Sequence, residues 1–185
     1  IALAMQKWNL HRRIALSLVA LFGTRPRRLV AGFMLATALL SMWVSNTATT
    51  LMMLPIALSV VQLLGDNDDD DHLPVALLLG IAYAASIGGM GTLIGTPPNA
   101  FMAAFLAESY GYSIGFAEWL LIGLPLVAVL LPVAWAVLVF GVCRVGGAGN
   151  AASEGIIRDE LAALGPLGRG EKIVATVFTL TALAW

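Results

Sequence analysis

Two short polar stretches interrupt apolar runs of the sequence, and their residue types could bind ions. The first, SNTATT at residues 45–50, lies in the middle of residues 29–65, which contain no charged side chain. The second, GGMGTLIGTPPN at residues 88–99, lies within residues 73–107, which are also free of charge. Ser, Thr and Asn supply neutral oxygens and amide donors, and interrupted helices add carbonyls and N–H groups. This set of groups suits a small hard cation held by oxygens and an anion held by donors.

Neither apolar run contains Asp, Glu, His, Lys or Arg. A general acid or base, a proton relay and the usual metal ligands are therefore absent from both runs, and we expect no enzyme. A bound Na⁺ would have no fixed carboxylate beside it. The substrate anion could supply the compensating charge, so that cation and anion favour each other's binding.

Other interpretations of the motifs have less support. A phosphate loop is excluded because no Lys follows Gly95 and no strand precedes it. The acidic stretch at residues 65–72 lacks the spacing of a calcium loop and is expected to be an exposed linker. Cys143 stands alone and is expected to be a small embedded side chain. The GxxxG spacing of Gly91 and Gly95, and the small residues at 45–50, could instead serve close helix packing.

The composition indicates a membrane protein. The chain has 185 residues, of which 59% are hydrophobic and 11% are charged, and its net charge is −1. Charge-free runs of this length are typical of bilayer-embedded chains, and the few basic residues do not suggest a nucleic-acid partner. The sequence begins without Met and ends within an apolar run, so we expect a piece of a longer multi-pass protein of the inner or plasma membrane.

The length of the first run predicts a helical hairpin at residues 25–65. A membrane-spanning helix needs about 20 apolar residues. Residues 29–65 are too long for one span and barely sufficient for two, and SNTATT divides them near the centre. Each side of this tip has too few apolar residues for a full span. We therefore expect a re-entrant hairpin, with helices at residues 27–44 and 51–64 and a polar tip between them. Two full spans remain an alternative.

The remaining elements follow from breakers and charge. Glycines and the Pro-Pro pair predict a broken transmembrane helix at residues 73–107. Residues 119–143 form an uninterrupted span, and residues 171–185 begin another. Residues 1–24 and 153–167 are expected to be amphipathic arm helices. All ten Lys and Arg residues lie at or before residue 28 or between residues 144 and 172, which fits a hairpin entering from and returning to the cytoplasm.

The two polar clusters resemble the divalent anion:sodium symporter family, the carriers of dicarboxylates, citrate and sulfate. The similar segments are SMWVSNTATTLMMLPIALSV and GGMGTLIGTPPNAF, supported by AMQKWNLHRRIAL upstream and by RGEKIV before the last span. The resemblance implies an all-α integral membrane protein, an elevator-type carrier of two inverted repeats that works as a homodimer. This chain would form most of the first repeat. SNT and GTPPN each occur once, so it would hold half of a binding site.

The resemblance also implies roles for individual residues. Ser45, Asn46 and Thr47 would be the tip triplet, with Asn46 and Thr47 facing a substrate carboxylate and Pro97 at the same site. Na⁺, the co-transported ion, would be bound by Ser41, Ser45, Asn46 and a backbone carbonyl, either of Gly95 or of a residue between Gly88 and Gly91. The residues expected to shape the loop are Gly88, Gly89, Thr96, Pro98 and Asn99.

The function implied is therefore sodium-coupled symport of a divalent anion such as a C4-dicarboxylate. The alternative is a carrier of the same fold type for another anion, such as sulfate, citrate or an oxyanion, or a proton-coupled antiporter. An antiporter would need an ionisable group within the membrane, which neither run of this chain supplies. A purely structural membrane subunit would tolerate loss of Ser45 and Asn46.

Overall fold

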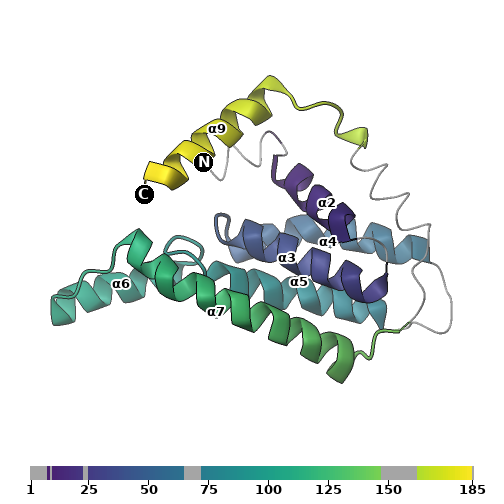
Figure 1. The fold of residues 1–185 in the computed structure, drawn as a ribbon, viewed down its shortest axis with the longest axis horizontal. Coiled ribbons are helices and arrows are strands. Elements are labelled where there is room, and N and C mark those ends of the chain that lie inside the picture. Colours follow the sequence, from purple (N-terminus) through teal and green to yellow (C-terminus); the bar gives the residue numbers. More distant parts are fainter. Residues whose placement is uncertain (1–7, 9, 23–24, 65–71, 147–161, 185) are drawn as a thin grey trace.

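The computed structural model describes residues 8, 10–22, 25–64, 72–146 and 162–184, and this part of the chain is helical and contains no strand (Figure 1). Most of the helices form one elongated bundle, and α6 extends beyond its end. The helices are α2 (Leu10–Phe22), α3 (Pro26–Ser41), α4 (Asn46–Leu64), α5 (Leu73–Gly89), α6 (Pro97–Tyr110), α7 (Phe116–Ala136), the π-helix η1 (Val137–Val142) and α9 (Arg169–Ala184).

Helices α3 and α4 form the predicted hairpin, but its turn is shorter than expected. Helix α3 ends at Ser41 and α4 begins at Asn46, so the predicted limits of 44 and 51 at the tip are corrected. The polar residues from Asn46 to Thr50 belong to the first turns of α4. The first backbone N–H groups of a helix have no partner within it, and the Ser45 hydroxyl accepts one from Ala48 at 3.4 Å.

Helices α5 and α6 are the two halves of the predicted broken helix. They are separated by residues 90–96, which are not helical, and α6 starts with Pro97 and Pro98 in its first turn. Proline is tolerated there because those N–H groups lack helical partners anyway. Helix α6 continues to Tyr110, past the expected limit of 107, and Gly111 ends it in the left-handed conformation at φ 65°.

Helix α7 begins three residues before the predicted start of 119. Glu118 explains the earlier start, because its Oε2 accepts a hydrogen bond from the Gly115 N–H at 3.0 Å and caps the helix. Together with η1, α7 forms a helix of 27 residues, Phe116–Val142, which is the one described helix long and apolar enough to cross a membrane. The apolar helices Asn46–Val61 and Leu73–Gly89 are shorter.

Helices α2 and α9 lie at the two ends of the sequence and are joined by an ion pair. Arg13 Nε of α2 is 2.9 Å from Glu171 Oε1 of α9. Helix α2 falls within the predicted arm 1–24, and α9 contains most of the predicted span 171–185. The predicted arm 153–167 lies mostly outside the described residues.

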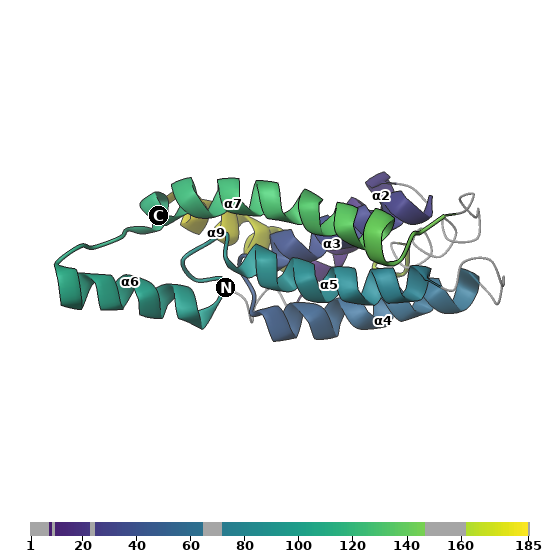
Figure 2. The ribbon, with the colours of Figure 1, turned by 90° about the horizontal axis from the view of Figure 1, so that it is seen from below.

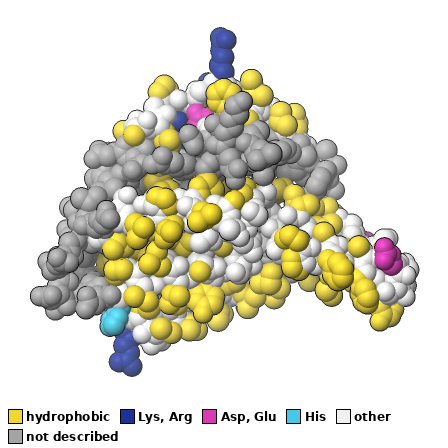
Figure 3. All heavy atoms as spheres, turned by 180° about the vertical axis from the view of Figure 1, so that it is seen from behind, with side chains coloured by type: hydrophobic (Ala, Val, Ile, Leu, Met, Phe, Trp, Pro, Cys, Tyr) yellow, Lys and Arg dark blue, Asp and Glu magenta, His cyan; other side chains and the backbone are white. Residues whose placement is uncertain are grey.

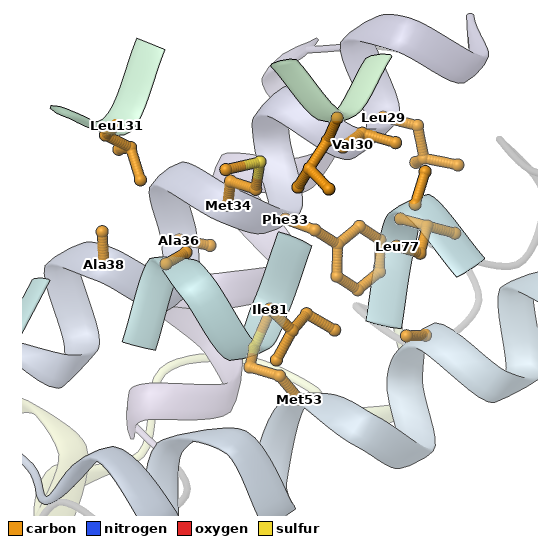
Figure 4. Close-up of a cluster of buried hydrophobic side chains, with 14 of the residues drawn as sticks. Leu29, Val30, Phe33, Met34, Ala36, Ala38, Met53, Leu77, Ile81 and Leu131 are labelled. Carbon is orange, nitrogen blue, oxygen red and sulfur yellow. The ribbon is translucent and has the colours of Figure 1, made fainter. Parts of the chain in front are cut away.

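Helix α3 is the centre of the bundle, packing against α2, α4, α5 and α7. Figure 2 shows α4 and α7 on opposite sides of α5. The core between them is apolar, and Figure 4 shows Phe33 of α3 near Leu77 and Ile81 of α5, with Met53 of α4 extending toward Ile81. All four side chains are buried. A core of this kind fixes the relative positions of the hairpin and α5.

Much of the surface of this bundle is apolar, and two of its helix backbones lie in direct contact. Hydrophobic side chains cover much of the face in Figure 3, and Phe101 of α6 and Leu121 of α7 are 75% and 77% exposed. Inside the bundle, a Cβ built on Gly88 would lie within 3 Å of three backbone atoms of Ala38. Glycine therefore allows α5 to contact the backbone of α3 next to the hairpin tip.

Candidate functional site

The hairpin tip and the interruption of the broken helix meet, as the two polar clusters of the sequence suggested. The Thr92 hydroxyl, which is buried, donates a hydrogen bond to the carbonyl oxygen of Met42. A Cβ built on Gly91 would lie 2.9 Å from Met42 Cε. The non-helical residues 90–96 therefore cover the turn between α3 and α4, and each interruption satisfies part of the other's backbone.

Ser41, the last residue of α3, gathers three oxygens at this junction. Its hydroxyl lies 2.7 Å from Asn46 Oδ1 of α4 and 2.7 Å from the Ala85 carbonyl oxygen of α5. A hydroxyl carries one proton and can donate it to only one of these oxygens at a time. Ser41 is fully buried, so the partial negative charges of the three oxygens are poorly screened by water. Neutral oxygens grouped in this way are the kind of ligand that an alkali cation takes.

Asn46 is held between Ser41 and the end of α5. It is half-buried, and its side chain lies against Gly89, where a Cβ would collide with Asn46 Oδ1. Gly89 therefore has no room for a side chain while Asn46 keeps this position. The amide oxygen of Asn46 faces Ser41, which leaves the amide nitrogen able to donate to an anion.

Asn99 fixes the shape of the non-helical segment. Its Nδ2 donates to the carbonyl oxygens of Gly89 and Thr92, both at 2.8 Å, and the side chain is buried. These two bonds use both N–H groups of the amide and connect the first turn of α6 with the end of α5. Gly95 packs directly on the Gly89 carbonyl. The segment is thus an ordered loop whose carbonyl groups have defined directions.

Helix α7 supports the same loop from the outside. Trp119 Nε1 donates to the Met90 carbonyl oxygen at 3.0 Å. A Cβ built on Gly123 would lie 2.6 Å from the Gly91 carbonyl oxygen and 2.9 Å from that of Met90. The long apolar helix therefore approaches the loop so closely that glycine is required at residue 123.

The structure brings some of the predicted site residues together and separates others. Ser41 and Asn46 are in contact, and Gly95 and Asn99 both lie against the carbonyl oxygen of Gly89. Ser45 and Thr47 are exposed at the tip, and Thr96 is half-buried. Pro97 and Pro98 are exposed at the start of α6. The carbonyl of Gly91 lies against Gly123, and the backbone of Gly88 lies against Ala38.

Sequence reasoning missed several residues of this junction. The carbonyl of Ala85 carries no sequence signal, because every residue has a carbonyl and only the packing of α5 on α3 brings this one to Ser41. Trp119 and Gly123 lie in an apolar run that gave no sign of contact with the loop. Thr92 could have been found, since it is a hydroxyl within an expected helix break.

The chemistry available at the junction is that of neutral oxygens and amide donors. Among the described residues, no three His, Cys, Asp or Glu side chains are grouped so as to hold a metal ion. The hydrogen-bonding groups around Ser41 are a hydroxyl, an amide and a carbonyl. These groups can bind an alkali cation and a carboxylate without any proton transfer.

Comparison with known proteins gives a consistent result over the whole chain. The family model described as citrate transporter matches residues 1–185. The sodium-dependent dicarboxylate transporter SdcS of Staphylococcus aureus strain USA300 is 38% identical over 192 aligned residues, which cover 100% of this chain and 37% of that protein. The same protein of strain NCTC 8325 gives the same identity and coverage. The chain thus spans little more than a third of the length of these curated relatives.

Proposed function

Because the chain belongs to the citrate transporter family, we propose that it is part of a sodium-coupled symporter of divalent anions such as C4-dicarboxylates. The protein would be integral to the cell membrane, and Na⁺ would be a transported ion with no catalytic role. This chain would supply one half of the binding site. Its relative is a sodium-dependent dicarboxylate transporter, which supports both the cation and the anion class.

The observation that carries the proposal is the oxygen cluster at Ser41. One hydroxyl proton faces two acceptors at 2.7 Å each, so the hydroxyl can donate to only one of them at a time. A cation between the oxygens would interact favourably with all three at once. Ser45 is next to Asn46 and could add a fourth oxygen from the exposed side of the tip.

The substrate anion would bind beside the cation, at the exposed side of the junction. The Asn46 amide nitrogen and the Thr47 hydroxyl lie in the first turn of α4, where free backbone N–H groups and the helix dipole favour a negative charge. The start of α6 at Pro97 is the second helix N-terminus adjoining the loop. Cation and carboxylate would then neutralise each other, which makes their binding cooperative.

The mechanism we propose is elevator-type alternating access. The hairpin at residues 25–65, re-entrant in the membrane, and the broken helix at 73–107 would form the moving transport domain. The span at 119–143 and the arms at 1–24 and 153–167 would connect it to the scaffold, which begins again at 171–185. In its support, α4 begins and α5 ends at the site, and both are shorter than the 27-residue helix Phe116–Val142. A homodimer is part of the same proposal.

The test is uptake of labelled succinate into liposomes containing the full-length protein. An inward Na⁺ gradient should drive uptake, and an H⁺ gradient imposed without Na⁺ should not. Competition by unlabelled succinate, citrate and sulfate then identifies the anion class. Uptake that follows the H⁺ gradient, or that is equal in Na⁺ and K⁺, would contradict sodium coupling. Na⁺-driven uptake of labelled sulfate or citrate, with no uptake of labelled succinate, would replace the dicarboxylate assignment.

A further inference from the structure

Thr49 of α4 is a buried hydroxyl without a partner, next to the proposed cation site. Its exposure is 0%, and among the described residues its Oγ1 is the only buried side-chain nitrogen or oxygen that forms no hydrogen bond. Burying such a group costs free energy unless a partner binds it. The position therefore calls for a specific reason.

The usual way to satisfy a helical hydroxyl is not taken here. Ser and Thr in a helix can donate to the carbonyl four residues earlier. Thr37 and Thr50 do so, at 2.6 Å to Phe33 and 2.8 Å to Asn46. The Thr49 backbone N–H bonds to the Ser45 carbonyl at 2.9 Å, but the Thr49 hydroxyl does not. The lone pairs and the proton of Oγ1 are thus both available to another ligand.

The helix register places Thr49 beside the oxygen cluster. Thr49 follows Asn46 by three residues, so both lie on the same face of α4 at neighbouring turns. Helices α4 and α5 run antiparallel, and Asn46 lies against Gly89 (Figure 2). One turn further along each helix, Thr49 is level with Ala85, whose carbonyl accepts from Ser41. A ligand bound by Ser41 and the Ala85 carbonyl would be within the same layer as Thr49.

We infer that Thr49 Oγ1 is a further oxygen ligand of the Na⁺ held by Ser41, Asn46 and the Ala85 carbonyl. This inference rests on the proposed sodium coupling. A hydroxyl oxygen left without a hydrogen-bond partner keeps both lone pairs for the cation. Its burial on the inner side of Asn46 puts it opposite the exposed tip, where the anion is proposed to bind. Thr49 therefore completes the cation site from the side away from the substrate.

The experiment compares Thr49→Val with Thr49→Ser in the full-length protein reconstituted in liposomes. Valine removes the oxygen at nearly constant volume, and serine keeps it. We expect Thr49→Val to raise the Na⁺ concentration for half-maximal succinate uptake about tenfold, as for the loss of one interaction with a charged group. Thr49→Ser should stay within about twofold of the unchanged protein. The KM for succinate at saturating Na⁺ should be the same in all three.

Thr37→Val is the matched control, because Thr37 is equally buried but bonded within its own helix. It should leave the Na⁺ dependence unchanged. If Thr49→Val does not fold, Thr49→Ala with Thr37→Ala as control has the same two outcomes. Na⁺-dependent uptake that Thr49→Val or Thr49→Ala leaves unaltered would overturn the role of Thr49 alone. Uptake by the unchanged protein that does not depend on Na⁺ would overturn the proposed function as well.

Discussion

At the scale of single residues, the site depends on three oxygens that meet at Ser41. Ser41 has one proton for two acceptor oxygens, and its own side chain is fully buried in the bundle. Asn46 is oriented by this contact and by the absence of a side chain at Gly89. The cation affinity that we propose follows from this local excess of oxygens.

Replacing Ser41 by Ala should weaken Na⁺ binding and destabilise the protein. The Ala85 carbonyl and Asn46 Oδ1 would both lose their contact with the Ser41 hydroxyl, at a cost of about 1–3 kcal/mol in the free energy of unfolding. Thermal unfolding of the purified full-length protein, with and without Na⁺, measures both effects. Ser86→Ala is the control, since Ser86 is exposed and bonds to Ala82 within α5. An equal stabilisation by Na⁺ in Ser41→Ala and Ser86→Ala would refute the role of Ser41.

At the scale of elements, the loop at residues 90–96 is ordered by the helices around it. Asn99 of α6 donates to the Thr92 carbonyl oxygen in the loop and to the Gly89 carbonyl oxygen just before it. Trp119 of α7 donates to the Met90 carbonyl oxygen. Such bonds replace those that an unbroken helix would have made, which is the condition for irregular backbone within a membrane. The loop therefore keeps a defined shape next to the hairpin tip.

Replacing Trp119 by Phe should loosen this loop. The change removes the N–H that donates to Met90 and costs about 1 kcal/mol. Hydrogen exchange of the amides of residues 90–96 should become faster. Trp135→Phe is a matched control at the other end of the same helix, where Nε1 donates to the Arg27 carbonyl, also at 3.0 Å. If both variants leave exchange in the loop equally slow, Trp119 does not hold it.

The elements were largely predictable from the sequence, and their limits less so. Run lengths and the positions of SNTATT and GGMGTLIGTPPN locate the hairpin and the broken helix, because a bilayer limits how long an apolar run can be. The end of α3 at Ser41 and the start of α4 at Asn46 were missed, since they depend on satisfying the first N–H groups of α4. The Ala85 carbonyl could not be predicted, because only the packing of α5 on α3 brings it to Ser41.

At the scale of the whole molecule, side-chain hydrogen bonds connect α2, near the start of the chain, with α9 and the residues just before it. Arg13 of α2 bonds to Glu171 of α9 and also donates from Nη2 to the Leu164 carbonyl oxygen at 2.9 Å. Glu171 in turn accepts from the Gly168 N–H at 2.7 Å. The segment that leads into α9 is thus tied to the first described helix. In the proposed mechanism this connection belongs to the arms that support the moving domain.

Breaking the pair should weaken the connection between α2 and α9 without disturbing the oxygen cluster. A double-mutant cycle of Arg13→Gln and Glu171→Gln should give a coupling of about 1 kcal/mol in unfolding free energy. The Na⁺ concentration for half-maximal uptake should not change in either variant. Lys172→Gln, at an exposed neighbouring residue, is the control. A coupling near zero would show that the ion pair does not connect the two helices.

The most direct test of the account is Na⁺-driven succinate uptake by full-length Asn46→Ala in liposomes. Asn46 is the one side chain proposed to contact both ions, so its loss should abolish Na⁺-dependent uptake while the protein still inserts in the membrane in normal amount. Ser59→Ala, on an exposed part of α4 where the hydroxyl bonds to the Pro55 carbonyl, should transport normally. Uptake by Asn46→Ala equal to that of Ser59→Ala would contradict a site at the hairpin tip.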